Sequence, residues 1–222
     1  MVSTTIQALL RTLAARDPYT AHHSLRVTEI ATCFAFYLGL SSREIVTLQN
    51  AVILHDIGKI GISDAILNKP GPLTPEERAI ITTHPLIGDL IVEPLNLTPG
   101  EREIILLHHE RWDGTGYPQG LAGSKIPLLC RLTSLADVYD AMTSDRPYRQ
   151  RFSAAQTLAE IESQAGRLFD PDLTKKFVAF LSSARQKLPD RLPAPRLTFF
   201  RRAEGPGQTQ TSASTHTTAT KV

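Results

Sequence analysis

The candidate metal-binding and catalytic residues of this chain are its histidines and the aspartates near them. Six of the seven histidines lie between positions 22 and 109, and two pairs are adjacent, His22–His23 and His108–His109. The dipeptide His55–Asp56 directly follows the apolar run 51–54. Because a carboxylate is rarely buried unless it is paired or bound to a cation, the position of Asp56 predicts such a partner.

His84 and Asp137 extend this set of polar residues beside apolar segments. Asp137 lies within the apolar stretch 128–142, where its carboxylate also needs a partner. A lone histidine on a helix is ordinarily a core or surface residue. Several imidazoles and carboxylates on separate helical segments, however, are typical of a metal site inside a helical bundle. Ligands of these two kinds, without thiolate, favour iron, manganese, nickel or zinc.

The candidate ligands outnumber the needs of a single metal ion. Two ions about 3.5–4 Å apart that share a bridging carboxylate would account for the excess, and such pairs catalyse in-line displacement at phosphorus. These residues therefore favour a binuclear phosphohydrolase over a structural metal site.

Length and composition are those of a soluble globular protein. The 222 residues suffice for one substantial domain, and 41% hydrophobic with 21% charged residues excludes wholesale disorder. No apolar run approaches the roughly 18 residues of a membrane span, and the N-terminus shows no secretory signal. Cys33 and Cys130, the two cysteines, lie in apolar runs and indicate a reducing compartment, so we expect a cytoplasmic protein.

The net charge of +2 is unevenly distributed along the chain. Residues 186–222 carry six basic and two acidic side chains, which leaves −2 on residues 1–185. The body of the chain therefore lacks the basic surface that duplex nucleic acid requires, and no such partner is expected. The terminal segment is also rich in Pro, Gly, Ser and Thr, and it is predicted to be a disordered tail.

The elements that must position the histidines are predicted to be helices. Capping boxes mark four helix starts: Ser41 with Glu44, Thr74 with Glu77, Thr98 with Glu101, and Ser153 with Gln156. Asp170 followed by Pro171 marks a fifth. Apolar residues recur at helical spacing between these starts and sustained alternation is absent, so the predicted fold class is all-α. Two Gly- and Pro-rich loops, 61–73 and 111–127, interrupt the pattern.

Longer motifs carry a family resemblance: HDIGK at His55–Lys59, HHERWDGTGYP at His108–Pro118, and ADVYDAMTSDRPYR at Ala136–Arg149. They resemble the HD-GYP family, a branch of the HD phosphohydrolase superfamily. RDPYTAHHSLRV at Arg16–Val27 and ILNKPGPLTPEE at Ile66–Glu77 match further stretches of that family, so the resemblance runs from about residue 16 to 180. It implies a compact HD-type helical bundle with a Gly/Pro-rich GYP loop. It also implies a metal-dependent phosphodiesterase that opens cyclic di-GMP to linear pGpG and often continues to GMP.

The resemblance implies a set of metal ligands as well. One divalent ion would be held by His23, His55, Asp56 and Asp137, and the second by His84, His108 and His109, with Asp56 bridging. His22 is left outside the site. Some family members bind a third ion through a glutamate at the position of Tyr19, so the tyrosine favours two ions. Iron and manganese are expected first, with nickel and zinc as further candidates.

Catalytic roles follow from the same resemblance. A metal-activated water would be the nucleophile, with Asp56 and Lys59 as the catalytic residues. Lys59 would contact the substrate phosphate or protonate the leaving group. It follows His55 by four residues, about one helical turn, so we expect it to project on the same side. The alternative is a solvated surface lysine.

Further substrate contacts are implied in two motifs: Gly116, Tyr117 and Pro118 of GYP, and Arg146 and Arg149 of DRPYR. Glycine lets the backbone approach a ligand, and the tyrosine ring offers a face for guanine. An arginine binds two phosphate oxygens at once. The alternative for both arginines is pairing with Asp140 or Asp145.

Two other functions remain open from the sequence. One is an HD phosphohydrolase for another cyclic dinucleotide. The other is a catalytically weak sensor that binds a cyclic dinucleotide and acts through a protein partner. Every motif position of the family is filled, which favours the enzyme.

We divide the chain into a helical segment at 1–15, a catalytic domain at 16–185 and the tail at 186–222. The first segment is amphipathic, with Ile6, Leu9, Leu10 and Leu13, and it either covers the bundle or mediates formation of a homodimer. Family members often carry an N-terminal receiver or sensory domain, for which the residues before His23 leave no room. The chain is then expected to act alone, to be controlled by a regulatory protein partner, or to be a fragment.

Overall fold

The computed structural model describes residues 4–145 and 151–187, and within them it contains helices and two isolated β-bridges but no strand. The all-α prediction is confirmed. The elements are α1 (Thr4–Arg16), α2 (Pro18–Tyr37), α3 (Ser42–Val52), η1 (Ile57–Gly61), α4 (Asp64–Leu67), α5 (Pro75–Ile81), α6 (His84–Val92), η2 (Glu93–Leu95), α7 (Pro99–Leu107), η3 (Gly123–Lys125), α8 (Leu128–Thr143), α9 (Ala154–Ser163) and α10 (Pro171–Lys187). The backbone of α10 continues to Lys187, and the rest of the predicted tail lies outside the described residues.

The predicted helix starts are confirmed by their hydrogen bonds. All four capping boxes are complete in both directions, at the starts of α3, α5, α7 and α9. The Asp170 carboxylate accepts hydrogen bonds from the backbone N–H groups of Asp172 and Leu173 at the start of α10. The predicted loop 61–73 is partly wrong, because it contains the short helix α4.

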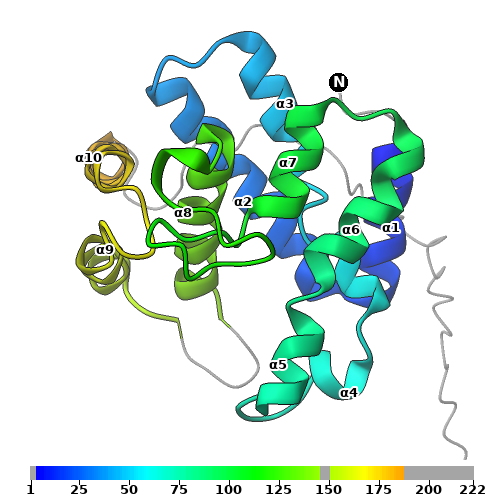
Figure 1. Cartoon of the computed structure of the whole chain (residues 1–222). Helices are drawn as coiled ribbons and strands as arrows, with labels where there is room; N and C mark the ends of the chain where they lie inside the picture. Colours follow the sequence, from blue (N-terminus) through cyan, green and yellow to red (C-terminus); the bar gives the residue numbers. More distant parts are fainter. Residues whose placement is uncertain (1–3, 146–150, 188–222) are drawn as a thin grey trace, which may run out of the picture.

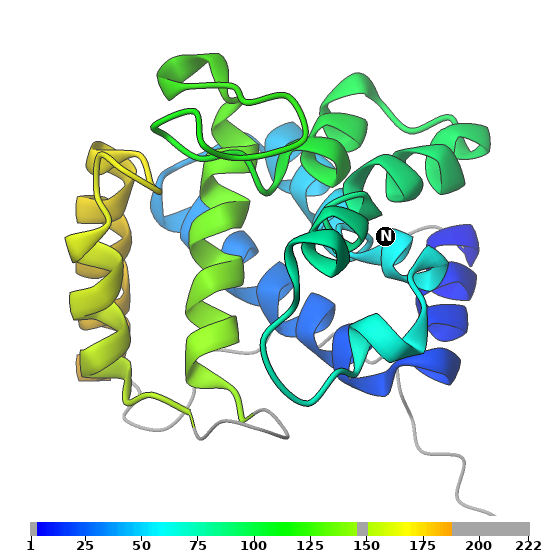
Figure 2. The same cartoon turned by 60° about the horizontal axis from the view of Figure 1, so that its bottom comes forward.

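The core lies between α2, α3, α7 and α8, with α9 and α10 packed side by side beyond α8 (Figures 1 and 2). Phe34 of α2 and Phe177 of α10 meet edge to face in this core, with ring centroids 4.9 Å apart. On the opposite side, α1 packs against α2 and buries Ile6, Leu10 and Leu13. The amphipathic N-terminal segment therefore covers the bundle, which was one of its two interpretations.

The HDIGK segment is not α-helical, which corrects the expected orientation of Lys59. Helix α3 ends at Val52, and the chain continues through tight turns into the 3₁₀ helix η1. A backbone hydrogen bond from Lys59 N–H to Asp56 C=O (3.0 Å) is of the i to i+3 type. Because a 3₁₀ helix has about three residues per turn, Lys59 lies over Asp56 rather than over His55.

Gly58 allows η1 to pack directly against α6. A Cβ added at Gly58 would lie 1.9 Å from the carbonyl oxygen of His84 and 2.5 Å from the backbone nitrogen of Gly88. Both neighbours are backbone atoms, so no rotamer change relieves the clash. This glycine therefore sets how closely the His55–Asp56 turn approaches His84.

We expect Gly58→Ala to lower the free energy of unfolding by about 2–3 kcal/mol, because the added methyl group must separate η1 from α6. Urea denaturation followed by circular dichroism measures this change. Gly100→Ala is the matched control, because the nearest atom to its added Cβ is a side-chain carbon of Thr47 at 3.5 Å. Equal stability of the two variants would contradict the tight contact.

Candidate metal centre

The structure brings the predicted metal ligands together from separate elements. His23 lies on α2, Asp137 on α8, the His55–Asp56 pair between α3 and η1, His84 at the start of α6, and His108–His109 directly after α7. The ligand atoms of all of them except Asp137 form two groups, in each of which all atoms lie within 4.8 Å of one another: Asp56, His84, His108 and His109, and His23, His55 and Asp56. Asp137 lies beside the second group, with Oδ1 2.9 Å from Nε2 of His23. Asp56 belongs to both groups.

Three of the imidazoles are oriented by their own backbone. The Nδ1 atoms of His55, His84 and His108 donate to the carbonyl oxygens three residues earlier, at 2.6, 2.8 and 2.9 Å. Because a carbonyl only accepts hydrogen bonds, the proton must be on Nδ1 and the lone pair on Nε2. The local turn at each histidine thus points a basic nitrogen at the centre.

These nitrogens fit a divalent cation. The Nε2 atoms of His84 and His108 are 3.3 Å apart, and with both Nδ1 protons engaged elsewhere their lone pairs face each other. The buried Nε2 of His55 has no hydrogen-bond partner within the described residues. Burial lowers the pKa of His84 and holds that of His108 well below its usual range, so both rings stay neutral. A cation between the His84 and His108 rings would satisfy their two lone pairs, and a second cation beside His55 would satisfy the third.

Asp56 joins the two groups through its two oxygens. Oδ1 lies 3.4 Å from Nε2 of His84, whereas Oδ2 lies 3.5 Å from Nε2 of His55 and 3.9 Å from Nε2 of His23. Burial alone would raise the pKa of this carboxyl, but the Lys59 ammonium and the surrounding imidazoles hold it well below its usual range. The result is a buried carboxylate with one oxygen facing each group of imidazoles.

His23 lies between two carboxylates. Its Nε2 is 2.9 Å from Asp137 Oδ1 and its Nδ1 is 2.7 Å from Asp140 Oδ2. Burial opposes the charged ring, yet hydrogen bonds to these two carboxylates raise the pKa of His23 to about 9. The pKa of Asp137 is lowered despite its burial, chiefly by the hydrogen bond from His23.

Sequence reasoning missed the role of Asp140. The sequence suggested Asp140 only as an alternative partner for arginines of the DRPYR motif, but it contacts His23 and forms two hydrogen bonds with Arg26, at 2.7 and 2.9 Å. Its spacing of three residues from Asp137 on one helix was the available signal, since such residues share a face. Carboxylates in this position fix the tautomer and orientation of a metal-binding histidine.

The GYP segment lies against the histidines. The Tyr117 ring centroid is 4.8 Å from that of His109 and 6.5 Å from that of His84. Burial raises the pKa of the Tyr117 hydroxyl, which therefore stays protonated near neutral pH. Burial also lowers the pKa of His109 to about 3, so this ring is neutral. Gly116 precedes the tyrosine, and a cis peptide bond joins Tyr117 to Pro118.

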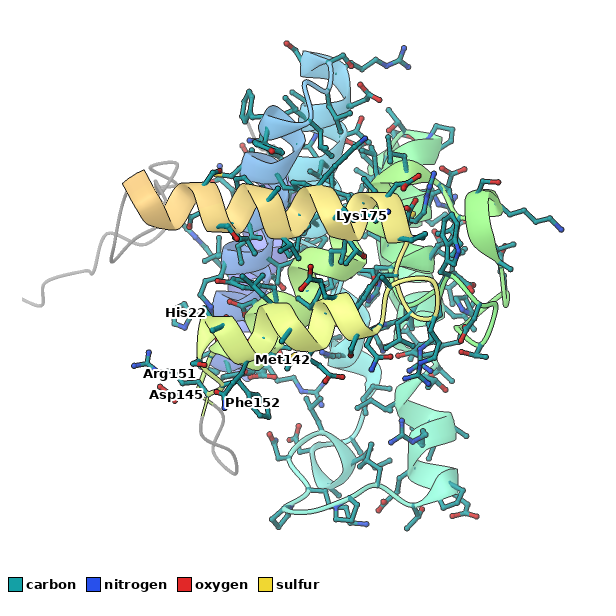
Figure 3. The ribbon with its side chains drawn as sticks, turned by 90° about the vertical axis from the view of Figure 1, so that its left-hand side faces the viewer. His22, Met142, Asp145, Arg151, Phe152 and Lys175 are labelled. Carbon is teal, nitrogen blue, oxygen red and sulfur yellow. The ribbon has the colours of Figure 1, made fainter. Side chains whose placement is uncertain are left out.

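Of the remaining predicted site residues, Lys59 lies among the described residues and the two arginines do not. Lys59 borders the centre, with Nζ 2.6 Å from Asp56 Oδ2 and its side chain 22% exposed. Arg146 and Arg149 lie outside the described residues. His22, labelled in Figure 3, is exposed and belongs to neither group of ligand atoms.

Residues 7–173 match the family model for the HD domain. The chain belongs to the HD domain family. Divalent metal binding is a property of HD domains, and the two groups of ligand atoms around Asp56 supply the residues for it. Among the described helices of this HD domain, none is both long and apolar enough to cross a bilayer.

Three curated relatives of this HD-domain chain are phosphodiesterases by name. The cyclic di-GMP phosphodiesterase response regulator RpfG of Xanthomonas campestris is 43% identical over 75% of this chain and 45% of its own length. A cyclic di-GMP phosphodiesterase of Thermotoga maritima is 43% identical over 73% of this chain and 45% of its own length. The 3'3'-cGAMP-specific phosphodiesterase 3 of Vibrio cholerae is 36% identical over 83% of this chain and 39% of its own length. The chain thus spans less than half the length of these relatives.

The fold is shared with solved HD-domain structures. Bd1817 of Bdellovibrio bacteriovorus, described as a HDG"Y"P protein, aligns with a TM-score of 0.61 at 22% identity, over 73% of this chain and 52% of that one. At this identity the similarity shows the fold alone.

Proposed function

We propose that this chain is a metal-dependent phosphodiesterase that hydrolyses cyclic di-GMP to linear pGpG, with GMP as the product of a second hydrolysis. The observation that carries the proposal is Asp56, whose two oxygens face two separate groups of imidazoles. A carboxylate shared in this way is what a pair of ions at a phosphoryl centre requires. The names of the relatives, and the match of the HDIGK and GYP motifs, support cyclic di-GMP as the substrate.

The proposed ligands are those predicted from the sequence: His23, His55, Asp56 and Asp137 for one ion, and Asp56, His84, His108 and His109 for the other. When bound, divalent ions supply activation of a water molecule and neutralisation of phosphate charge. The nitrogen and oxygen donor set favours iron or manganese, with nickel or zinc as further candidates. Asp140 and Arg26 keep His23 in place while it binds.

Lys59 is the proposed proton donor to the leaving oxygen. Its ammonium is held 2.6 Å from Asp56, next to both groups of imidazoles, and its side chain remains partly accessible to a ligand. Tyr117 is the proposed contact for a guanine base, because its ring lies beside His109 and His84 at the edge of the same centre. Arg146 and Arg149 stay predicted phosphate contacts. A cytoplasmic location and a second copy or regulatory protein as partner also stay predictions.

The proposal is tested by turnover of cyclic di-GMP with protein purified without oxygen, while bound metal is quantified on the same sample. We expect about two ions per chain, linear pGpG as the first product, and loss of activity in a sample treated with a chelator. Restored activity on adding back iron or manganese identifies the working ion. A chain that holds two ions and does not hydrolyse the substrate would support a cyclic-dinucleotide sensor instead.

A second substrate deserves a direct comparison because a 3'3'-cGAMP-specific enzyme is among the relatives. The two cyclic dinucleotides should be offered at equal concentration in one reaction, with products separated by chromatography. Preferential loss of cyclic di-GMP supports the main proposal. Preferential loss of 3'3'-cGAMP assigns the chain to the other substrate.

A further inference from the structure

Glu110, the residue that follows the two histidines of the HHE sequence, is buried among backbone donors. It is 3% exposed, and its two oxygens accept hydrogen bonds from the backbone N–H groups of Gln119 at 2.7 Å and Leu121 at 2.9 Å. These donors lie one and three residues after Pro118, which follows the cis Tyr117–Pro118 peptide bond. One carboxylate therefore holds the part of the GYP loop that folds back after Gly116, at Gln119 and at Leu121.

The same returning segment is pressed onto the backbone of residues 109–111. Tyr117 N–H donates to the carbonyl oxygen of His109 at 3.3 Å. A Cβ added at Gly116 would lie 2.4 Å from the backbone nitrogen of Arg111 and 2.6 Å from Cα of Glu110. Tyr117 thus depends on contacts with residues 109–111 for its position beside His109.

The outer part of the loop is attached to a different element. Trp112 and Asp113 donate their backbone N–H groups to the carbonyl oxygens of Leu168 and Arg167, in the connection between α9 and α10. The Arg131 guanidinium lies 5.7 Å from the centre of the Trp112 ring and 2.5 Å from the carboxylate of Asp170. Because these contacts hold the outer part independently, loss of the Glu110 carboxylate should release only the inner part, which carries Tyr117.

We propose that Glu110 is a positioning residue that sets the place of Tyr117 relative to His109 and thereby the affinity for the nucleotide part of the substrate. The inference rests on the proposed function of the centre. Hydrogen bonds from backbone N–H groups to a carboxylate are stronger than those to a neutral acceptor, and an ionised carboxylate accepts hydrogen bonds but cannot donate them. An amide at this position presents an NH₂ group to one of the two N–H donors, so one of the two bonds is lost. Within the described residues, the Glu110 side chain forms no hydrogen bond with Lys59 or with the nitrogen atoms of the candidate metal ligands.

The test is Glu110→Gln, measured with cyclic di-GMP and with bis(p-nitrophenyl) phosphate, a diester that carries no nucleobase. We expect the KM for cyclic di-GMP to rise about tenfold, because a buried charge-assisted hydrogen bond is lost and the base contact is misplaced. The metal content and the kcat with bis(p-nitrophenyl) phosphate should match the wild type. Glu103→Gln, at an exposed glutamate on α7, is the matched control for the loss of one charge.

Each alternative outcome is distinguishable. Equal losses of activity with cyclic di-GMP and with bis(p-nitrophenyl) phosphate, together with loss of metal, would overturn the inference and make Glu110 a structural support of the whole centre. An unchanged KM for cyclic di-GMP would also overturn it. If the wild type does not hydrolyse cyclic di-GMP, the proposed function fails, and amide hydrogen exchange still tests the inference: faster exchange in Glu110→Gln confined to residues 116–121 supports it, and unchanged exchange contradicts it.

Discussion

Asp56→Asn is expected to remove both ions and to reduce hydrolysis of cyclic di-GMP by about 10⁴-fold, the scale seen when a central catalytic residue is lost. The asparagine side chain has nearly the same shape, but it lacks the charge that attracts a cation, and only one of its two terminal atoms accepts a metal. Asp56 is the residue shared by both groups of ligand atoms, so one substitution affects both. Metal analysis and steady-state kinetics on the same preparation measure the two effects.

The fold should survive this substitution, because the apolar core between α2, α3, α7 and α8 is unchanged. Circular dichroism checks that point. Asp64→Asn is the matched control: Asp64 is an exposed carboxylate at the start of α4, paired with Arg16 at 3.0 Å, and its loss should alter neither metal content nor turnover. Retention of two ions and of activity in Asp56→Asn would refute the assignment of Asp56 as the bridging ligand.

Lys59→Ala is expected to keep both ions and to lower kcat by about 10²–10³-fold, the range typical for removing one group that stabilises transition-state charge. The substitution deletes the ammonium that lies 2.6 Å from Asp56, while the imidazoles and carboxylates of the centre stay in place. Without it, the leaving oxygen loses its proposed proton donor. Single-turnover kinetics separates this loss from an effect on product release.

Lys175→Ala provides the control for removal of a lysine. Lys175 is exposed on α10, away from His22 and the start of α9 (Figure 3). A Lys59→Ala variant with wild-type kcat would show that Lys59 only balances the charge of Asp56. A variant that loses metal would place its role in assembling the centre rather than in the reaction.

Local patterns in the sequence were sufficient to predict where several of the helices start. A capping box needs only two side chains three residues apart, and all four examples form as expected because the interacting groups lie within one helical turn. The motif resemblance likewise identified residues that the structure brings together around Asp56. Each of these inferences depends on residue type and on short spacing, which a sequence displays directly.

The structure was needed wherever a role depends on contact between distant segments. Asp140 is 117 residues from His23 in sequence, and its carboxylate is available to the imidazole only because α2 packs against α8. Glu110 receives its two N–H donors only because the loop folds back at Gly116. The three-residue spacing of Asp140 from Asp137 indicates a shared helix face, but it does not indicate the contact with His23, because such contacts form through packing between elements and not within them.

The chain's sequence by itself determined the fold class, five of the helix starts and the chemical types available for a metal centre. Tertiary structure alone decided that Lys59 lies over Asp56, that each Asp56 oxygen faces a different group of imidazoles, and that Asp140 and Glu110 hold His23 and the GYP loop. The physical reason is one of range. Helix formation is driven by interactions across three or four residues, whereas the angle and reach of a buried side chain are set by how closely separate backbones pack, as Gly58 shows against His84.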